Sequence, residues 1–466
     1  MNDRNIKRYV WRAAQLLFFG FACLSVYILY LQSIQADELA THPSNRRAMA
    51  AESDIVRGRI LDASNQILAY TDERGSRIYP MKDMMAPITG YMGETIGSAG
   101  IEGSENQKLL GLTEHTSRLG PIRQLLVSDH GNDVKLTLHA GLQKTAYDAL
   151  GKRRGAIVVL DARTGAVIAM VSRPSFDPNH AEENWTSLNQ QQDSPLLNRA
   201  SQGLYPPGST LKVMIAEAAL QEKTTDFKEV FHCTGKLDLG GGYVLQESHG
   251  AVHGSVNLEQ ALAESCNITF ATLAMRMGAK SLDKTFERYG FHRAIEGDVL
   301  ESMPHLPKFA QLGTGDIAQV GIGQSELLVS PLRMAMLASA FANQGVIMKP
   351  YLLDEVISPN GVIIEKGQQH KWLQVTSPEQ ALQIDQLMEK VVTEGTGRAA
   401  QVQGVRVTGK TGTAENPGGA DHAWFIGNAD IRGRMYSFAV LVENSGGGGT
   451  EAAPIARRII TDLLDE

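Results

Sequence analysis

The sequence predicts an α+β fold, in which an antiparallel sheet is covered by helices and a helical subdomain lies beside the sheet. Strand patterns occur at both ends of the main region of the chain, at residues 156–160 and 166–172 and again at 404–414 and 436–443. Helical periodicity dominates the sequence between them, from about residue 209 to about residue 341. Strands from both ends of a region can join into one sheet, which helices from its middle then cover.

The first strands are predicted to form a hairpin at one edge of this sheet. Residues 134–138 alternate like a strand, and residues 140–150 have the 3.6-residue period of a helix. The buried apolar strand 156–160 leads into a turn at 161–165, after which the chain returns as the strand 166–172. Two strands joined by so short a turn pair antiparallel.

The later elements follow the same periodic patterns. The clearest helices of the central block are residues 258–277 and 331–341. The strands 404–414 and 436–443 flank a loop rich in Gly and Pro, and the glycine run 446–449 is typical of a flexible turn. Residues 454–464 form an amphipathic helix at the end of the chain.

Residues 13–31 are predicted to cross a membrane. They carry no charge and a single side-chain amide, Gln15, and as a helix they span about 28 Å, close to the thickness of a bilayer core. The acidic residues Asp37 and Glu38 follow the segment. Four basic residues precede it, namely Arg4, Lys7, Arg8 and Arg12. The positive-inside rule therefore places residues 1–12 in the cytoplasm and the chain after about residue 32 outside.

Two alternatives to a single-pass anchor are a cleaved signal peptide and a lipoprotein. The apolar run is long for a signal peptide, and Ile34-Gln35-Ala36 is a poor small-x-small cleavage site. A lipid-modified Cys23 would need a large aliphatic residue three positions earlier, where the sequence has Gly20. These features favour an uncleaved anchor in the cell membrane.

Length and composition predict an ordinary globular protein with several domains. The chain has 466 residues, 43% of them hydrophobic and 20% charged. Its formal net charge of −7, with no basic block beyond the N-terminus, argues against a nucleic-acid partner. We divide the chain into a cytoplasmic tail, a transmembrane helix, a polar linker, a small mixed pedestal without a cluster of catalytic side chains, and a main domain. Their ranges are 1–12, 13–31, 32–54, 55–133 and 134–466.

Three cysteines give little framework for disulfides. Cys23 lies in the predicted membrane segment, so Cys233 and Cys266 form the single possible pair outside it. The extracellular compartment permits a disulfide, but two buried thiols fit the sequence as well.

The first chemical motif is a turn that leads directly into a helix. Its sequence is Tyr-Pro-Pro-Gly-Ser-Thr-Leu-Lys, residues 205–212, and the Pro-Pro-Gly segment predicts a helix start at or next to Ser209. Lys212 then lies on the same face of the first turn as the Ser209 hydroxyl. A lysine whose pKa is lowered by burial or a second cation can activate a serine, and the helix N-terminus favours an oxyanion beside it. The alternative is a simple helix cap.

The second motif contains two short polar side chains after an apolar helical run. Ser265 and Asn267 follow residues 258–263, and burying them is costly unless they form hydrogen bonds. In a functional site, Ser265 would pass a proton between nucleophile and leaving group, while Asn267 would bind the substrate amide and Lys212. Alternatively, both bond to local backbone carbonyls.

The third motif is Lys410-Thr411-Gly412-Thr413, within a predicted strand. Gly412 weakens a strand unless another backbone or a ligand comes close, and we expect a peptide that pairs with the strand edge. Lys410 would supply a cation that lowers the pKa of a nearby amine, and Thr411 and Thr413 would hold a terminal carboxylate. The alternative is an edge strand whose lysine prevents aggregation.

In this order, S-x-x-K, S-x-N and K-T-G resemble the motifs of the class B penicillin-binding proteins, the membrane-anchored D,D-transpeptidases that cross-link peptidoglycan. The resemblance covers nearly the whole chain. Further similar segments are residues 57–62, the hairpin 156–172 with residues 174–179 after it, 253–254, 321–324 and 341–345. The chain departs from the class in its short pedestal, which puts partner binding by that region in doubt, and in Cys266 as the middle residue of the second motif.

The resemblance implies a penicillin-binding transpeptidase (β-lactamase-like) domain at residues 134–466. Ser209 would attack the bond between two terminal D-alanines, with neutral Lys212 as base, and the backbone N–H groups of Ser209 and Thr413 would form the oxyanion hole. D-alanine would leave with a proton delivered through Ser265, and an amine of a neighbouring stem peptide would resolve the acyl-enzyme. β-Lactams would acylate Ser209, and no cofactor or metal is expected. A membrane glycan polymerase is an expected partner.

Three other kinds of function are alternatives to transpeptidation. A D,D-carboxypeptidase or β-lactamase needs a carboxylate that positions water, for which Glu217 and Glu264 are the candidates. A β-lactam sensor would signal through several membrane helices, whereas one is predicted here. A structural protein with a dead site would not need three intact motifs.

A zinc site is a further alternative that the sequence offers. The residue types His232, Cys233, His249 and His253 suit zinc, but their spacing matches no common motif.

Overall fold

The computed structural model describes residues 3–33, 35, 55–112, 129–416 and 418–465. The chain divides into two compact units, Met1–Val56 and Arg57–Glu466. In the first unit, helix α1 (Asp3–Ser33) contains a segment, Tyr9–Leu31, that is long and apolar enough to cross a membrane. A signal sequence near an N-terminus would have the same properties. Most of the predicted linker, residues 32–54, lies outside the described residues.

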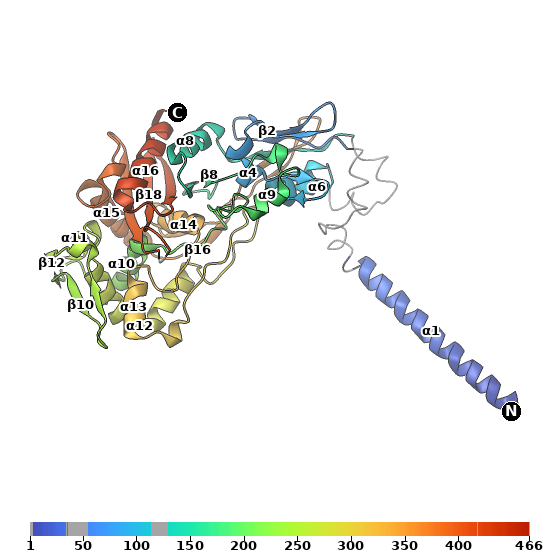
Figure 1. Cartoon of the computed structure of the whole chain (residues 1–466), viewed down its shortest axis with the longest axis horizontal. Coiled ribbons are helices and arrows are strands. Elements are labelled where there is room, and N and C mark those ends of the chain that lie inside the picture. Colours follow the sequence, from blue (N-terminus) through green and yellow to red (C-terminus); the bar gives the residue numbers. More distant parts are fainter. Residues whose placement is uncertain (1–2, 34, 36–54, 113–128, 417, 466) are drawn as a thin grey trace. The chain divides into compact units, whose positions relative to one another are not determined.

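An antiparallel five-stranded sheet forms the centre of the second unit (Figure 1). Its strands, in spatial order, are β17 (Arg406–Ala414), β18 (His422–Ile431), β19 (Arg434–Val442), β7 (Gly155–Asp161) and β8 (Val167–Arg173). All neighbours pair antiparallel, and the β7–β8 hairpin lies at one edge. The predicted fold class and edge hairpin are therefore confirmed.

The sequence prediction missed strand β18, which occupies 10 residues of the segment 415–435 that was assigned to a Gly/Pro-rich loop. Residues 422–427 are a nearly continuous apolar run, without the alternation that marks a strand with one solvated face. Both faces of β18 are covered, so neither set of side chains needs to be polar. Trp424 and Ile426 pack on one side of the sheet, whereas Ala423 and Phe425 pack on the other.

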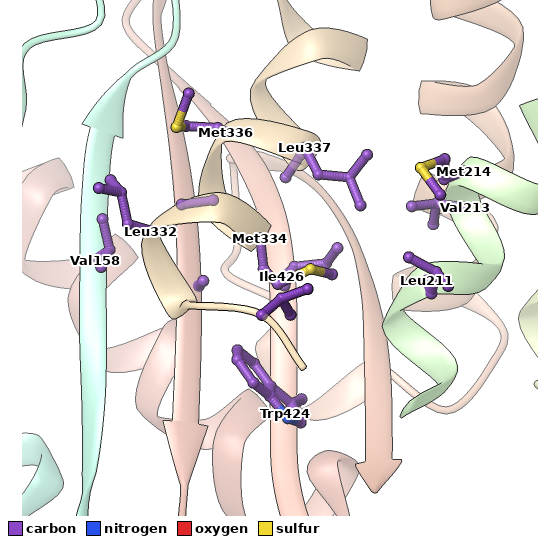
Figure 2. Close-up of a cluster of buried hydrophobic side chains, with 14 of the residues drawn as sticks. Val158, Leu211, Val213, Met214, Leu332, Met334, Met336, Leu337, Trp424 and Ile426 are labelled. Carbon is purple, nitrogen blue, oxygen red and sulfur yellow. The ribbon is translucent and has the colours of Figure 1, made fainter. Parts of the chain in front are cut away.

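Helices cover the two faces of this sheet. On one face, α8 (Ala140–Leu150) and α16 (Gly448–Asp465) share a hydrophobic cluster with the sheet, so the predicted flexible turn at 446–449 is partly helical. On the other face lies α14 (Pro331–Ala342). Figure 2 shows the α14 side chains Leu332 and Met334 beside Val158, Trp424 and Ile426 of the sheet.

The helical subdomain is interrupted where the sequence predicted one helix at 258–277. Helix α11 (Leu258–Ala263) ends, and α12 (Asn267–Arg288) starts after Cys266. Ser265 between them has φ +60°, which a continuing helix does not allow. The other helices of this region are α10 (Lys212–Gln221), α13 (Thr314–Gly321) and α15 (Pro378–Thr393).

Two small hairpins beside these helices were not predicted. Strand β9 (Phe231–Cys233) pairs with β12 (Gly254–Val256), and β10 (Lys236–Asp238) pairs with β11 (Val244–Gln246). Each strand has three residues, too few for a periodic pattern to show in the sequence. Strand β12 contacts α11, and both are seen together in Figure 1.

A second sheet joins the small N-terminal region to the main domain. Its six strands, in spatial order, are β15 (Ile363–Lys366), β14 (Leu353–Ile357), β6 (Asp133–Leu136), β1 (Ile60–Leu61), β2 (Ile67–Thr71) and β3 (Arg77–Ile78). The sheet therefore crosses the predicted boundary between residues 133 and 134, whose position stays a prediction.

The remaining elements are short. They are η1 (Lys82–Met84), α4 (Ala86–Thr89), β4 (Met92–Gly93), β5 (Gly97–Ser98), α5 (Gly100–Ser104), α6 (Asn106–Leu109), η3 (Pro178–His180), α9 (Trp185–Gln190), η4 (Gly208–Leu211), η5 (Ser248–Gly250), η6 (Phe309–Gln311), β13 (Val346–Met348), β16 (Lys371–Gln374) and η7 (Arg398–Ala400).

Removing a large side chain from the sheet should destabilise the second unit. Phe438 is fully buried and stacks on Phe425, with ring centroids 6.0 Å apart. We expect Phe438→Ala to lower the free energy of unfolding by about 3–5 kcal/mol, because the cavity cannot fully collapse. Urea unfolding followed by tryptophan fluorescence measures this. The exposed Phe227 is the control, and an equal loss in Phe227→Ala would contradict the assignment.

Candidate active site

The Ser209 turn is held rigidly against the central sheet. Ser209 lies in the 3₁₀ turn η4, which runs directly into α10, so the predicted helix start is confirmed. The indole N–H of Trp424 donates to the Pro206 carbonyl at 3.0 Å, and the Thr210 hydroxyl donates to the Pro207 carbonyl at 2.6 Å. Ser209 itself is half-buried, so its hydroxyl is presented from a fixed backbone.

Two glycines let another segment approach this turn. Gly208 has φ +54° and donates its N–H to the carbonyl of Gly323 at 2.9 Å. Gly323 has φ +74°, and a Cβ at that position would overlap the Gly208 carbonyl oxygen. The segment 321–324, which follows α13, therefore supports the Ser209 turn from the side of the helical subdomain.

A buried carboxylate that the sequence analysis missed supports the same turn. Glu443 Oε1 accepts hydrogen bonds from the Tyr205 hydroxyl and from Arg199 Nε, both at 2.8 Å. Its Oε2 accepts from Arg154 Nε at 3.0 Å. Glu443 follows β19 immediately, so the sheet fixes the residues that precede Ser209. A signal was available in the sequence, since an acidic residue directly after the apolar run 438–442 is costly to bury without partners.

Lys212 brings the first two motifs together. Its side chain is fully buried, and its Nζ donates to the Ser265 carbonyl at 2.7 Å and to Asn267 Oδ1 at 2.6 Å. Ser265 Oγ lies 3.3 Å from the same nitrogen. The contact between Asn267 and Lys212 that the sequence analysis expected is therefore present. The helix break at Ser265 is what turns both its carbonyl and its hydroxyl toward Lys212.

Burial lowers the pKa of Lys212 to about 8, although the charge of Glu247 opposes this change. Burial also lowers the pKa of Lys410 well below its usual value, and the positive charge of Lys212 adds to this effect. The charge effect therefore acts on Lys410, which is the reverse of the prediction that Lys410 supplies the cation; the pKa of Lys212 is lowered by burial. The site therefore contains an amine that can act as a base.

Strand β17 places the third motif against the Ser209 turn. Gly412 leaves room for that turn, because a Cβ there would come within 2.8 Å of Thr210 Cγ2 and 3.2 Å of the Pro207 carbonyl oxygen. The sequence analysis expected a bound peptide as the close neighbour of Gly412, but the neighbour is the turn of the first motif. Thr411 is buried and shares a hydrogen bond of 2.6 Å with Thr396, whereas Thr413 is exposed. Within the described residues β17 ends the sheet, which leaves its outer edge open to a strand-like ligand.

Glu247 organises the second motif and was not singled out in the sequence. Its carboxylate accepts the backbone N–H groups of Asn267 at 2.9 Å and Ile268 at 2.8 Å, at the start of α12. Burial alone would raise its pKa, but these two hydrogen bonds, a third from the Cys266 thiol and the charge of Lys212 together outweigh burial and lower the pKa. The Cys266 thiol also donates to it at 3.2 Å. Both Cys233 and Cys266 are free and buried, so the alternative of a disulfide is wrong.

The two candidate water-positioning carboxylates differ in their surroundings. Glu217 is buried and engaged by Arg288 Nη2 at 2.7 Å and the Tyr289 hydroxyl at 3.0 Å. Glu264 is exposed at the end of α11. Arg288 Nη1 also donates to Glu217 Oε1 at 3.0 Å, so both carboxylate oxygens of Glu217 have partners. These contacts connect α10 to the C-terminal end of α12.

Comparison with known proteins agrees with this geometry. Residues 155–461 match the family described as the penicillin binding protein transpeptidase domain, and residues 57–129 match the penicillin binding protein A dimerisation domain. The peptidoglycan D,D-transpeptidase PbpA of Mycobacterium tuberculosis (strain H37Rv) is 33% identical, over 93% of this chain and 94% of that protein. MrdA of Acinetobacter baumannii is 30% identical, over 82% of this chain and 65% of its own length.

Solved structures give the same assignment. The imipenem acyl-enzyme complex of penicillin-binding protein A from M. tuberculosis has a TM-score of 0.80 and 30% identity, and the match covers 89% of this chain and 100% of that one. The D,D-transpeptidase domain from Eggerthella lenta has a TM-score of 0.80 and 31% identity, over 88% of this chain and 99% of that one. The three motifs, their common site and these matches agree: the chain belongs to the penicillin-binding protein transpeptidases, with the class B proteins PbpA and MrdA as relatives.

Proposed function

We propose that this protein is a peptidoglycan D,D-transpeptidase that works through an acyl-enzyme on Ser209 and is inhibited by β-lactams at the same residue. The observation that carries the proposal is the buried Lys212 amine, which lies one helical turn from Ser209 and contacts both polar residues of the second motif. Relatives solved as acyl-enzyme complexes with imipenem and penicillin G support β-lactam binding.

In the acylation step, neutral Lys212 accepts the proton of the Ser209 hydroxyl while Oγ attacks the carbonyl carbon between the two terminal D-alanines. The backbone N–H groups of Ser209 and Thr413 donate to the resulting oxyanion. The C–N bond then breaks, and the leaving amine receives a proton from Lys212 through the Ser265 hydroxyl, which lies 3.3 Å from Nζ. D-alanine departs, and the donor stem peptide stays bound as an ester.

In the second step, an amine from a neighbouring stem peptide attacks this ester. Its proton returns along the same route, and Ser209 leaves with a proton, so the enzyme is regenerated. Lys212 serves in both directions because its pKa of about 8 leaves roughly one tenth of the amine neutral at pH 7.

The remaining site residues bind the donor. Its backbone pairs with the open edge of β17, and Asn267 holds a substrate amide through Nδ2, one of whose two hydrogens lies toward the Gln246 carbonyl at 3.4 Å. Thr413 is exposed and holds the terminal carboxylate, whereas Thr411, the second residue expected to hold it, is buried with its hydroxyl bonded to Thr396. Gly412 keeps the strand close to the Ser209 turn. No cofactor enters these steps.

The proposed setting is the outer face of the cell membrane. Helix α1 would anchor the protein with its N-terminus in the cytoplasm, because four basic residues precede the apolar segment. The catalytic domain would then face the peptidoglycan stem peptides, and a membrane glycan polymerase would be its partner. Hydrolysis by Glu217 is disfavoured, since its carboxylate is held by Arg288 and Tyr289.

Ser209→Ala should abolish covalent labelling by a fluorescent penicillin, because it removes the proposed nucleophile and leaves the Ser265 hydroxyl, 3.3 Å from Lys212 Nζ, with only its role in proton transfer. The control is Ser187→Ala, which removes an exposed hydroxyl on α9 and should label like the parent. Labelling that persists in Ser209→Ala on a denaturing gel would show that another residue is the nucleophile.

A synthetic pentapeptide donor and a diamino-acid acceptor should give a cross-linked dimer together with free D-alanine. Mass spectrometry of the products separates transfer from hydrolysis. Release of D-alanine without any dimer, at several acceptor concentrations, would contradict transpeptidation and leave a carboxypeptidase.

The rate constant for β-lactam acylation should rise from about pH 6 to about pH 9 and level off above a pKa of about 8. The lowered pKa means that Lys212 loses its proton in this range, and only the neutral amine accepts the Ser209 proton. Stopped-flow acylation with a chromogenic cephalosporin measures the profile, with enzyme-free hydrolysis subtracted. A rate that is flat or falls across this range would contradict Lys212 as base.

Gly323→Ala should slow acylation at least ~10-fold while the protein remains folded, because strain of about 1–3 kcal/mol is placed next to Gly208. Gly313→Ala is the matched control, since Gly313 has φ −79° and its nearest contact would be 3.5 Å from a Cβ. Equal acylation rates in both variants would show that the 321–324 segment does not position the Ser209 turn.

A further inference from the structure

A short segment after α15 connects the second motif with the third. Residues 394–397 read Glu-Gly-Thr-Gly and follow the last residue of α15. The backbone N–H of Thr396 donates to the carbonyl of Ala263 at 3.1 Å, and Ala263 ends α11 two positions before Ser265. The Thr396 hydroxyl shares a hydrogen bond of 2.6 Å with the hydroxyl of Thr411 in β17. One residue thus contacts the helix before the second motif and the strand of the third.

Two glycines permit this close approach and fix the backbone of Thr396. A Cβ at Gly395 would come within 2.2 Å of the Ala263 carbonyl oxygen. Gly449, in the first turn of α16, faces Thr396 from another direction, because a Cβ there would lie 2.7 Å from the Thr396 carbonyl oxygen. The position of Thr396 is therefore set by α11, α15 and α16 together, independently of any ligand.

The hydroxyl of Thr411 depends on this contact. Thr411 is 6% exposed, and in the part of the chain that the structure describes its hydroxyl bonds to Thr396 alone. A buried hydroxyl without a partner is costly, so the loss of Thr396 Oγ1 would favour a shift of Thr411 and of the strand that carries it. Thr396 itself is exposed, so a change of its side chain opens no cavity in the core.

The position of β17 matters because the donor peptide contacts both motifs. In the proposed function the donor pairs with the open edge of β17, and Thr413 of that strand holds its terminal carboxylate. Asn267 holds an amide of the same donor from the side of the second motif. A donor can make both sets of contacts only at one separation between the second motif and β17.

We propose that Thr396 is a positioning residue for the donor, whose hydroxyl holds Thr411 and thereby fixes the separation between the second motif and β17. This inference rests on the proposed acylation of Ser209. Among the described residues, Thr396 makes no hydrogen bond to Ser209, Lys212 or Ser265. Its hydroxyl therefore acts on the binding of the donor and leaves the proton transfers unchanged.

The test is stopped-flow acylation of the full-length chain in detergent by a chromogenic cephalosporin. The dependence of the rate on cephalosporin concentration gives two constants, the dissociation constant of the complex before acylation and the limiting acylation rate. Thr396→Val removes the hydroxyl and keeps a branched side chain. It should raise the dissociation constant at least ~5-fold and leave the limiting rate within about 2-fold of the parent.

Two variants serve as controls for this measurement. Thr396→Ser keeps the hydroxyl and should recover most of the binding. Thr393→Val makes the same chemical change three residues earlier, where an exposed hydroxyl donates to the Glu389 carbonyl at 3.1 Å, and it should behave like the parent.

Three results would overturn the proposal. They are equal dissociation constants in Thr396→Val and Thr393→Val, equal impairment in Thr396→Ser and Thr396→Val, and a lower limiting rate with an unchanged dissociation constant. A parent that is not acylated at all would instead sink the proposed function, and this inference with it. The two failures are therefore distinguishable.

A double-mutant cycle tests the hydrogen bond itself. Thr411→Val removes the same bond from its other end, so it tests the proposal even where Thr396→Val fails to fold. The dissociation constant should rise about as much in the double variant as in either single variant, because one bond is lost in all three. Effects that add in the double variant, or a Thr411→Val variant that binds like the parent, would overturn the proposal.

Discussion

The burial of the Lys212 amine is the constraint on which the active site depends. A buried ammonium is costly unless hydrogen bonds hold it, and the Ser265 carbonyl and Asn267 side chain supply those bonds. The same burial lowers the pKa of Lys212 toward neutrality, which a base in acyl transfer requires. The break between α11 and α12 makes the Ser265 carbonyl available to Lys212. In a continuous helix this carbonyl would accept a hydrogen bond from a backbone N–H of the same helix.

The sheet and the helical subdomain each hold one side of the site. From the sheet, Trp424 and Glu443 fix the residues before Ser209, and Gly412 lets β17 pack against the turn. From the subdomain, Gly323 meets Gly208 and Glu247 caps α12. The proposed nucleophile Ser209 and its proposed base Lys212 therefore belong to one short segment, which is held between the sheet and the helical subdomain.

The sequence predicted the fold class, the edge hairpin and the residues of all three motifs because each has a local signal: alternation, helical period or an unusual turn. It missed β18, because a strand covered on both faces does not alternate. It missed Glu247 and Glu443 because their partners lie far away in the chain, as with Glu443 and Arg199. It also treated 258–277 as one helix, because the break at Ser265 is imposed by the tertiary contacts of Lys212 and leaves no Gly or Pro in the sequence.

The central claim is that Ser209, in this clamped turn, is the residue that carries the acyl group. A crystal structure of the protein soaked with benzylpenicillin tests it most directly. The account predicts continuous density from Ser209 Oγ to the penicilloyl carbonyl carbon, with the carbonyl oxygen directed at the backbone N–H groups of Ser209 and Thr413. A penicilloyl group bonded to any other side chain, or one whose carbonyl oxygen points away from both N–H groups, would contradict it.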